Sequence, residues 1–342
     1  MRLGFTFNQK TKVGSPPAQG NDATPDDGEA EWDSPETIAA IHRVLAERHE
    51  VIPVEANEDA YSRLRAARPD LVFNVAEGRG GPNREALIPA MLEFLGIPYT
   101  GSDPQTLAIC LDKARTKEVL ASHDLPTPPF RVFEAGEAWA AWEHGFPAVV
   151  KPLHEGSSMG IFDDSVVDAP PALAERVRSV HARYRQPAIV ERFLPGAEFT
   201  VALLGNGRRL EALPIVEIDF STLPPGARPL YSYEAKWVWD VADRPLRIFR
   251  CPADLPLPLA SRIEETARAA FRALRCRDWC RIDLRLDESG TPHVLELNPL
   301  PGILPDPRDN SCFPKAAHAA GLTYSDLLHR VVDEARTRYG LH

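Results

Sequence analysis

The sequence contains no apolar run long enough to cross a membrane, because no stretch approaches the roughly 18 residues that a membrane helix requires. It also has no excess of basic residues. The formal net charge of −10 disfavours nucleic-acid binding, since neutralising phosphates requires a basic surface. Residues 1–5 resemble a strand rather than a signal peptide. We therefore expect a cytoplasmic protein whose partners include neither a membrane nor a nucleic acid.

The five cysteines show neither the spacing of a zinc site nor that of a disulfide framework, and their number is odd. We interpret them as reduced thiols. Internal repeats and coiled-coil heptads are absent from the sequence as well. At 342 residues, with 44% hydrophobic and 26% charged residues, the chain is typical of a soluble protein with two or three domains.

Strands and helices alternate over about the first hundred residues. Ser34 and Pro35 have the residue types of an N-cap and a first helical position. Strands are predicted at 3–7, 51–54 and 71–75, and helices at 34–45, 60–67 and 85–95. This alternation favours an α/β fold with a doubly wound parallel sheet. The apolar face of the third helix, with Leu87, Met91, Phe94 and Leu95, is interpreted as core rather than as an interface.

The rest of the chain mixes strands, helices and two long irregular segments. Helices are predicted at 103–123, 171–184 and 259–274, and strands at 148–152, 188–191, 199–204, 213–220 and 282–286. Residues 9–31 are rich in Pro, Gly, Asp and Asn and are predicted to form a long loop. The segment 221–243, rich in Pro, Tyr and Trp, is predicted to be a lid-like loop.

The most informative pattern is a β-hairpin near the C-terminus, in which residues 281–286 and 294–298 alternate around an Asp-Glu-Ser-Gly turn. Residues two apart share a face of a strand, so Arg281 and Asp283 point one way and Glu296 and Asn298 do likewise. Two carboxylates and an amide oxygen suit a hard cation such as Mg²⁺. The alternative is a hairpin with a charged, solvated face.

A glycine- and serine-rich turn follows the strand that ends at Lys151. In Glu155-Gly156-Ser157-Ser158-Met159-Gly160, small residues allow backbone N–H groups to approach an anion, and hydroxyls add donors. Lys151 could reach the same phosphates. The spacing is not that of a Walker A loop. An ordinary turn is the alternative.

Two further charged residues lie in unusual settings. Glu191 ends an apolar strand, where an unpaired charge is costly, so either a ligand donor such as an adenine amino group or a salt bridge to an arginine is expected. Glu198 follows Glu191 closely in the sequence and could accept hydrogen bonds from ribose hydroxyls. Lys236 lies among the aromatic residues of the lid segment, which could shield a charged reaction from water or simply pin the loop.

Taken together, these motifs resemble the ATP-grasp superfamily, and within it the D-alanine–D-alanine ligases. Eight anchors carry the resemblance in the right order over nearly the whole chain. They are residues 77–81 (EGRGG), 95–102 (LGIPYTGS), 112–113 (DK), 151–152 (KP), 155–160 (EGSSMG), 191 with 196–201 (E…GAEFTV), 233–236 (YEAK), and 281–283 with 296–298 and 301–302 (RID…ELN…PG).

The resemblance implies an ATP-grasp fold in three parts: an N-terminal Rossmann-like domain (1–101), a small central domain (102–194) and a C-terminal domain (195–342) containing the lid (221–243). It implies a homodimer formed through the N-terminal part. It also implies an ATP- and Mg²⁺-dependent ligase, with two Mg²⁺ ions or alternatively Mn²⁺, that joins a small-molecule carboxylate to an amine through an acyl phosphate.

The resemblance also implies residue roles. Phosphates would be held by Lys113, Lys151 and Lys236 with Ser157 and Ser158. The adenine would be held by Glu191 and the Leu194 backbone, and the ribose by Glu198. Metal ions would be held by Asp283, Glu296 and Asn298. Arg281 and the Gly302 amide would form the oxyanion hole, and Ser157 and Lys236 would assist catalysis.

The residues at positions where the family binds its amino-acid substrates depart from the family pattern. The family's His-Gly is Glu77-Gly78 here, the tyrosine after the lid lysine is Trp237, and a carboxylate-binding serine beyond the Pro-Gly turn is missing from residues 303–310. The acid that holds the first substrate's ammonium is unassigned around Glu31 and Asp33. We hypothesise that Asp33, Glu77, Trp237 and Arg308 contact different substrates. The alternatives are a genuine D-alanine–D-alanine ligase, a non-catalytic ATP-binding regulatory protein, and a phosphotransferase that stops at the acyl phosphate.

Overall fold

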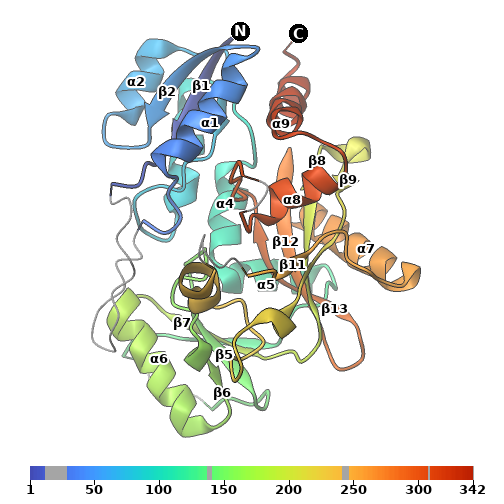
Figure 1. The fold of residues 1–342 in the computed structure, drawn as a ribbon. Helices are drawn as coiled ribbons and strands as arrows, with labels where there is room; N and C mark the ends of the chain where they lie inside the picture. Colours follow the sequence, from blue (N-terminus) through green and yellow to red (C-terminus); the bar gives the residue numbers. More distant parts are fainter. Residues whose placement is uncertain (12–28, 137–140, 241–245, 307–308, 342) are drawn as a thin grey trace.

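A computed structural model describes residues 1–11, 29–136, 141–240, 246–306 and 309–341. Within these ranges the strands form three sheets, and the fold is mixed α/β, as expected. In Figure 1 a small parallel sheet lies at the top, a four-stranded sheet at the bottom and the largest sheet at the right. Among the described residues no helix is both long and apolar enough to cross a membrane.

The N-terminal sheet is parallel, with strand order β2-β1-β3, as the alternation predicts. Its strands are β1 (Arg2–Phe7), β2 (Glu50–Glu55) and β3 (Leu71–Asn74), joined through α1 (Pro35–Ala46) and α2 (Ala60–Ala67). Ser34 is the N-cap of α1, since its hydroxyl accepts a hydrogen bond of 3.2 Å from the Thr37 N–H. A 3₁₀ turn (Arg84–Ala86) precedes α3 (Leu87–Leu95).

The interpretation of the α3 face as core is wrong for two of its residues. Leu87 is 49% exposed and Phe94 is 80% exposed. Met91 and Leu95 do pack against the hydrophobic cluster beneath the helix. The face is therefore only partly covered by the chain itself.

The single helix predicted at 103–123 is also wrong. The chain forms α4 (Pro104–Leu111) and α5 (Lys113–Ser122), separated at Asp112. Asp112 has extended backbone angles, and its carboxylate accepts hydrogen bonds of 3.0 Å from the N–H groups of Ala114 and Arg115. These bonds make Asp112 the N-cap of a new helix, which turns Lys113 and Lys117 into the interior.

The four-stranded sheet has the order β4-β7-β5-β6, and its pairs are antiparallel. It comprises β4 (Phe130–Phe133), β5 (Ala148–Pro152), β6 (Val166–Val167) and β7 (Ala188–Arg192). Helix α6 (Pro170–Tyr184) buries Leu173, Val177 and Val180 against it. Their spacing of three and four residues explains why this helix packs with one face.

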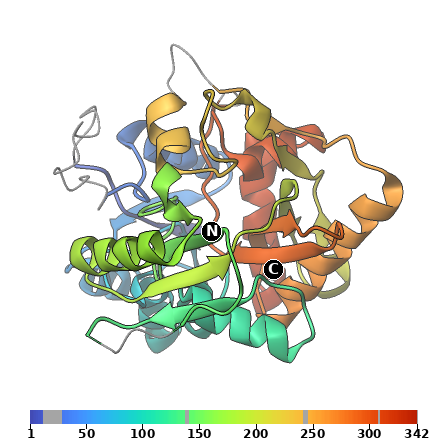
Figure 2. The same cartoon turned by 90° about the horizontal axis from the view of Figure 1, so that it is seen from below.

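The largest sheet has the order β11-β10-β8-β12-β13, with β9 also paired to β8. Its strands are β8 (Glu198–Leu204), β9 (Glu211–Ala212), β10 (Val216–Ile218), β11 (Phe249–Arg250), β12 (Trp279–Leu286) and β13 (Pro292–Asn298). The strand predicted at 213–220 is therefore wrong in extent: the chain makes two short strands on either side of Pro214, which lacks the N–H that a continuous ladder requires. Figure 2 shows this sheet beside the four-stranded one.

Three helices complete the C-terminal part. Helix α7 (Leu257–Ala273) packs on the apolar face of β8, β12 and β13. Helices α8 (Cys312–Ala319) and α9 (Tyr324–Tyr339) join the core of the N-terminal sheet. Within the lid segment, 234–239 form a π-helical turn (Glu234–Trp239), so the described part of this segment is more regular than predicted. Residues 12–28 of the predicted loop and 241–243 of the lid lie outside the described residues. All five cysteines are free.

Candidate active site

One pocket is lined by residues of the segments between β1 and α1, by the four-stranded sheet and the turn that follows its strand β5, and by the largest sheet. It is lined by most of the polar residues singled out in the sequence. Among them are Asp33, Lys151, Ser157, Ser158, Glu198, Lys236, Trp237, Arg281, Asp283, Glu296 and Gly302. Residues that lie almost three hundred positions apart thus share one cavity.

The predicted hairpin supplies the floor of this pocket. In the antiparallel pairing of β12 with β13, Asp283 lies opposite Glu296 and Arg281 lies opposite Asn298. On the other side of β12, Asp283 lies opposite Thr200 of β8. A bulge between Asp283 and Leu284, which the alternation did not predict, shifts the register beyond this point. The four polar hairpin residues therefore share one face, as predicted.

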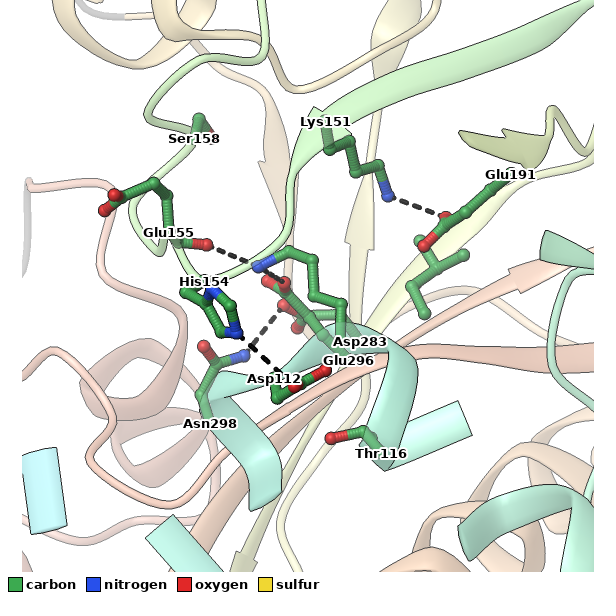
Figure 3. A network of polar contacts seen from close by, with 12 residues as sticks. Asp112, Thr116, Lys151, His154, Glu155, Ser158, Glu191, Asp283, Glu296 and Asn298 are labelled. Atoms are coloured by element: carbon green, nitrogen blue, oxygen red, sulfur yellow. Dashed lines mark hydrogen bonds and ion pairs between the residues drawn. The ribbon is translucent and has the colours of Figure 1, made fainter. Parts of the chain in front are cut away.

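Asp283 is held by three neighbours. The Thr200 hydroxyl donates to its Oδ1 at 2.6 Å, Arg281 Nη2 donates to its Oδ2 at 2.9 Å, and Asn298 Nδ2 lies 3.3 Å from Oδ2. Burial raises the pKa of Asp283. Figure 3 shows Asp283, Glu296 and Asn298 gathered at one point. This set of oxygen atoms is chemically suited to a hard divalent cation, which would replace part of the charge now supplied by Arg281.

Glu296 is the more strongly ionised carboxyl of the pair. Burial alone would raise its pKa, but the nearby charges of Lys113 and Arg281 outweigh that effect and lower the pKa to about 2. Its Oε2 lies 3.6 Å from Lys113 Nζ, and Lys113 also donates to the backbone carbonyl of Glu155. Lys113 thereby connects Glu296, a candidate metal ligand, to the glycine-rich turn.

Glu191 makes a salt bridge, although to lysines rather than to the arginine considered from the sequence. Its carboxylate lies 2.9 Å from Lys151 Nζ and 3.3 Å from Lys117 Nζ. Burial would raise the pKa of Glu191, yet the two ammonium groups together lower it. Figure 3 shows Lys151 pointing towards Glu191. Lys117 is completely buried, and burial lowers its pKa to about 8. Leu194, just beyond β7, is buried beside this group.

Glu198 has a partner that the sequence reading overlooked. In the register of β8 with β12 it lies opposite Arg285, whose Nη1 donates to Glu198 Oε2 at 3.0 Å. The Arg285 guanidinium lies over the rings of Phe193 and Phe220, at 4.5 and 5.2 Å from their centroids. Burial raises the pKa of Glu198 despite this cation.

The glycine-rich turn has the geometry that its composition predicts. Ser157 and Ser158 both have a positive φ, at 49° and 61°, a conformation that turns successive N–H groups to one side. Ser158 donates its hydroxyl to the Tyr231 carbonyl of the lid at 2.9 Å. A Cβ at Gly156 would lie 2.2 Å from Glu31 Oε1, so only glycine fits there unless Glu31 moves.

Trp237 links the lid to this turn. Its indole N–H donates to the Ser157 carbonyl at 3.2 Å. The ammonium groups of Lys236 and Lys10 lie 5.2 and 5.1 Å from the centroid of its ring. Burial lowers the pKa of Lys236 to about 8. The indole thus lies between the glycine-rich turn and two ammonium groups.

An acidic corner lies next to the turn. Carboxyl oxygens of Glu31, Glu77 and Glu85 lie within 4.8 Å of one another. Arg84 Nη2 donates to Glu31 at 2.7 Å and lies 3.5 Å from Glu155. Burial, then the charge of Glu85, raises the pKa of Glu77 well above its usual range. Burial also raises the pKa of Asp33, a neighbour in the pocket, to about 7.

The turn after β13 brings Gly302 to the pocket. The Ser311 hydroxyl, also at the pocket wall, donates to the Gly302 carbonyl at 3.0 Å and accepts from the Leu304 N–H at 3.3 Å. Its hydroxyl therefore braces the turn. Arg308, proposed from the sequence as a substrate contact, lies outside the described residues.

Sequence reasoning missed Lys10, Lys117 and Arg285. Three signals could have indicated them. Arg285 continues the alternation of Arg281 and Asp283 on β12, and Lys117 follows Lys113 by one helical turn. In addition, the chain has only seven lysines against 32 arginines, and five of the seven (Lys10, Lys113, Lys117, Lys151 and Lys236) belong to this region.

Comparison with known proteins gives a consistent result. The model of the family described as "D-ala D-ala ligase C-terminus" matches residues 119–333. The chain is 35% identical to a D-alanine–D-alanine ligase of Desulforudis audaxviator, covering 85% of this chain and 89% of that one. It is 38% identical to the uncharacterized protein y4sG of Sinorhizobium fredii, covering 85% and 84%. A crystal structure of the D-alanine–D-alanine ligase of Bacillus anthracis has a TM-score of 0.72 at 25% identity, with each chain fully covered.

Proposed function

The chain belongs to the D-alanine–D-alanine ligase family of ATP-grasp enzymes and is an ATP-dependent ligase, and from this premise we propose that it joins substrates other than two D-alanines. A small-molecule carboxylate would attack the γ-phosphate of ATP to give an acyl phosphate and release ADP. An amine, in an amino acid or another metabolite, would then attack the acyl carbon, lose a proton and displace phosphate. The observation that carries this proposal is the rebuilt corner around Trp237, where an indole contacts the Ser157 carbonyl.

The nucleotide half of the proposal follows the family pattern. Phosphates would be held by Lys113, Lys151 and Lys236 with the turn at Ser157 and Ser158, adenine by Glu191 and the Leu194 backbone, and ribose by Glu198. Asp283, Glu296 and Asn298 would hold two Mg²⁺ ions, for which Mn²⁺ could substitute. Bound Mg²⁺ supplies positive charge that offsets the phosphoryl oxygens during transfer. Before phosphates bind, Lys151 is paired with Glu191 and Lys113 with Glu296.

The chemistry assigns roles to the remaining residues. Attack by the amine creates a tetrahedral oxyanion, which Arg281 and the Gly302 N–H would stabilise. The lid residues Tyr231 and Trp237 contact the turn at Ser158 and Ser157 and would exclude water, which otherwise hydrolyses an acyl phosphate.

The charged residues in the candidate substrate-binding part of the site also support the proposal of different substrates. Glu31 lies in the first-strand region where the family binds the first ammonium, but here it is paired with Arg84. Glu77 replaces the family's histidine and makes no hydrogen bond or ion pair with any residue that the structure describes. A pocket whose polar partners differ rejects the original substrate strongly, because unpaired buried groups are penalised.

The decisive experiment measures phosphate release from Mg-ATP against D- and L-amino acids and small carboxylates, singly and in pairs, with products identified by mass spectrometry. We expect turnover with a pair other than D-alanine. Turnover with D-alanine alone would instead establish the family reaction. If ATP binds but no pair reacts, a non-catalytic ATP-binding role gains support. Phosphate release that depends on the acid alone would indicate chemistry that stops at the acyl phosphate.

We expect substitution of Glu77 to change the pH dependence of substrate binding. If Glu77 holds a substrate ammonium, it must lose the proton that its raised pKa retains. The apparent KM of that substrate should then fall as pH rises, by up to about tenfold per unit while the pH stays below this pKa. Glu77→Gln should raise KM and abolish this slope, with Mg-ATP affinity unchanged.

Initial rates between pH 6 and 9 test this expectation. Glu58→Gln is the matched control, since Glu58 is an exposed carboxylate paired with Arg79 on the surface. An unaltered KM profile in Glu77→Gln would show that Glu77 does not contact the substrate.

We also propose a homodimer formed through α3. Its exposed Leu87 and Phe94 provide an apolar surface, and Tyr61 of α2 lies beside Phe94 with ring centroids 6.2 Å apart. Sedimentation analysis of the wild type and of Phe94→Glu tests this assembly. A monomeric wild type would contradict it.

A further inference from the structure

Lys10 occupies a fixed position at the edge of the pocket. It lies three residues beyond the end of β1 at Phe7. Its N–H donates to the Asp33 carbonyl at 2.9 Å, and the Asp33 N–H donates to the Asn8 carbonyl at 3.0 Å. Gln9 and Asp33 form a parallel bridge between these bonds. The backbone is therefore held on both sides, and the side chain reaches the pocket that also contains Lys236 and Arg281.

The ammonium group of Lys10 has no anionic partner among residues 1–11, 29–136, 141–240, 246–306 and 309–341. Among the described residues it makes no hydrogen bond or ion pair, and its recorded contact is with the face of Trp237 at 5.1 Å. Burial lowers its pKa, and the more distant charges of Asp33 and Glu29 offset this only in part. By contrast, Lys113, Lys117 and Lys151 each lie within 3.6 Å of a carboxylate.

Two ammonium groups that lack an ion pair with any described residue therefore lie against the same indole. Lys236, at 5.2 Å from the ring, is accounted for by the phosphates in the proposed function. Lys10 comes from the end of β1 and is not needed for the nucleotide. A partly desolvated ammonium with unused N–H groups is most stabilised by an anion, since hydrogen bonds between charged groups are the strong ones.

The surroundings of Lys10 select a singly charged anion. The carboxyl groups of Glu31 and Asp33 line the pocket with it. They disfavour a multiply charged anion such as phosphate more than a singly charged one. A carboxylate carries one charge and can accept two of the ammonium N–H groups. Moreover, the hydroxyl of Ser311, which also lines the pocket, is already bonded to Gly302 and Leu304.

We propose that Lys10 is a specificity-determining residue that binds a non-reacting carboxylate of a substrate. The proposal rests on the proposed ligase function and specifies it further: one substrate carries a carboxylate that takes no part in the new bond. That group belongs either to a dicarboxylic acid whose other carboxylate is activated, or to an amino acid that supplies the amine.

Side-chain NMR of the full-length protein labelled with ¹³C at lysine Cε tests this directly, because only seven lysine signals arise. Lys10→Arg identifies the signal of Lys10. The probes are succinate against succinamide for the first source, and glycine against glycinamide for the second. We expect one carboxylate probe to shift the Lys10 signal saturably and to raise its pKa, whereas the amide of the same probe does neither. The pair in which the acid and its amide differ in their effect on Lys10 identifies which kind of substrate carries the bound carboxylate.

Equal effects of acid and amide in both pairs, or a Lys10 signal that no probe moves, would overturn the proposal. The same spectra report separately on the nucleotide half. If Mg-ATP shifts the signals of Lys113, Lys151 and Lys236 while no probe shifts the Lys10 signal, the proposed role of Lys10 is wrong and the proposed function is unaffected. If Mg-ATP shifts none of them, the proposed function fails.

Kinetics with the substrate pair found by the panel provide a second readout. Lys10→Met should raise KM for the carboxylate-bearing substrate about 10- to 100-fold, the range expected for losing a charged hydrogen bond, with KM for ATP unchanged. Lys10→Arg should recover part of this affinity because it restores the cation. Lys315→Met, on α8, is the matched control and should behave as wild type. An unchanged KM in Lys10→Met would also contradict the proposal.

Discussion

Replacing Arg281 with methionine is expected to lower kcat about 10²- to 10³-fold, the usual effect of removing one oxyanion donor. Arg281 lies on the polar face of β12 opposite Asn298, and its guanidinium is held against Asp283 by bonds of 2.9 to 3.3 Å. In the proposed mechanism this fixed guanidinium would receive the negative charge of the tetrahedral intermediate. Formation of the acyl phosphate, which precedes that intermediate, should be affected less.

Positional isotope exchange in γ-labelled ATP, run with the acid substrate alone, separates the two steps. We expect exchange to persist in Arg281→Met while amide formation is nearly lost. Arg281→Lys should retain part of the activity, and Arg262→Met, on the surface of α7, should retain all of it. Equal loss of exchange and of amide formation would show instead that Arg281 acts earlier, through Asp283 and the metal ions.

Replacing Glu191 with leucine is expected to lower the free energy of unfolding by about 3–5 kcal/mol, as for other buried ion pairs that lose one partner. The substitution would leave Lys117, which is completely buried, and Lys151, which is 8% exposed, without their counter-charge. Urea denaturation followed by circular dichroism measures the change.

The matched control is Glu118→Leu, which removes one partner of the exposed pair with Arg115 on the same helix that carries Lys117. Exposed pairs contribute about 0–1 kcal/mol, so this variant should unfold almost as the wild type does. The double variant Lys117→Met/Glu191→Leu should recover part of the lost stability because it removes one of the two stranded charges. If Glu191→Leu were no more destabilising than Glu118→Leu, the buried lysines would not depend on Glu191.

Much of the fold, and the shared polar face of the hairpin, could be predicted because their signals are local. The alternation of Arg281, Asp283, Glu296 and Asn298 fixed which side chains share a face, since a strand has a period of two whatever it pairs with. Ser34 could be assigned as an N-cap for the same reason: its hydroxyl bonds to a backbone group three residues away. The break at Asp112 is also a local cap, but the apolar periodicity that continues across it concealed it.

The sequence alone therefore determined the α/β class and the hairpin with its carboxylates, because these depend on spacing along one segment. The partners of charged groups depend on which segments meet, and only the tertiary structure decided those. Glu191 lies opposite Lys117 because α5 packs beside β7, and Arg285 meets Glu198 because of the register between β12 and β8. Lys10 meets Trp237 across more than two hundred residues. The counter-charge of a buried group comes from whichever segment packs beside it, and no local periodicity in the sequence predicts that contact.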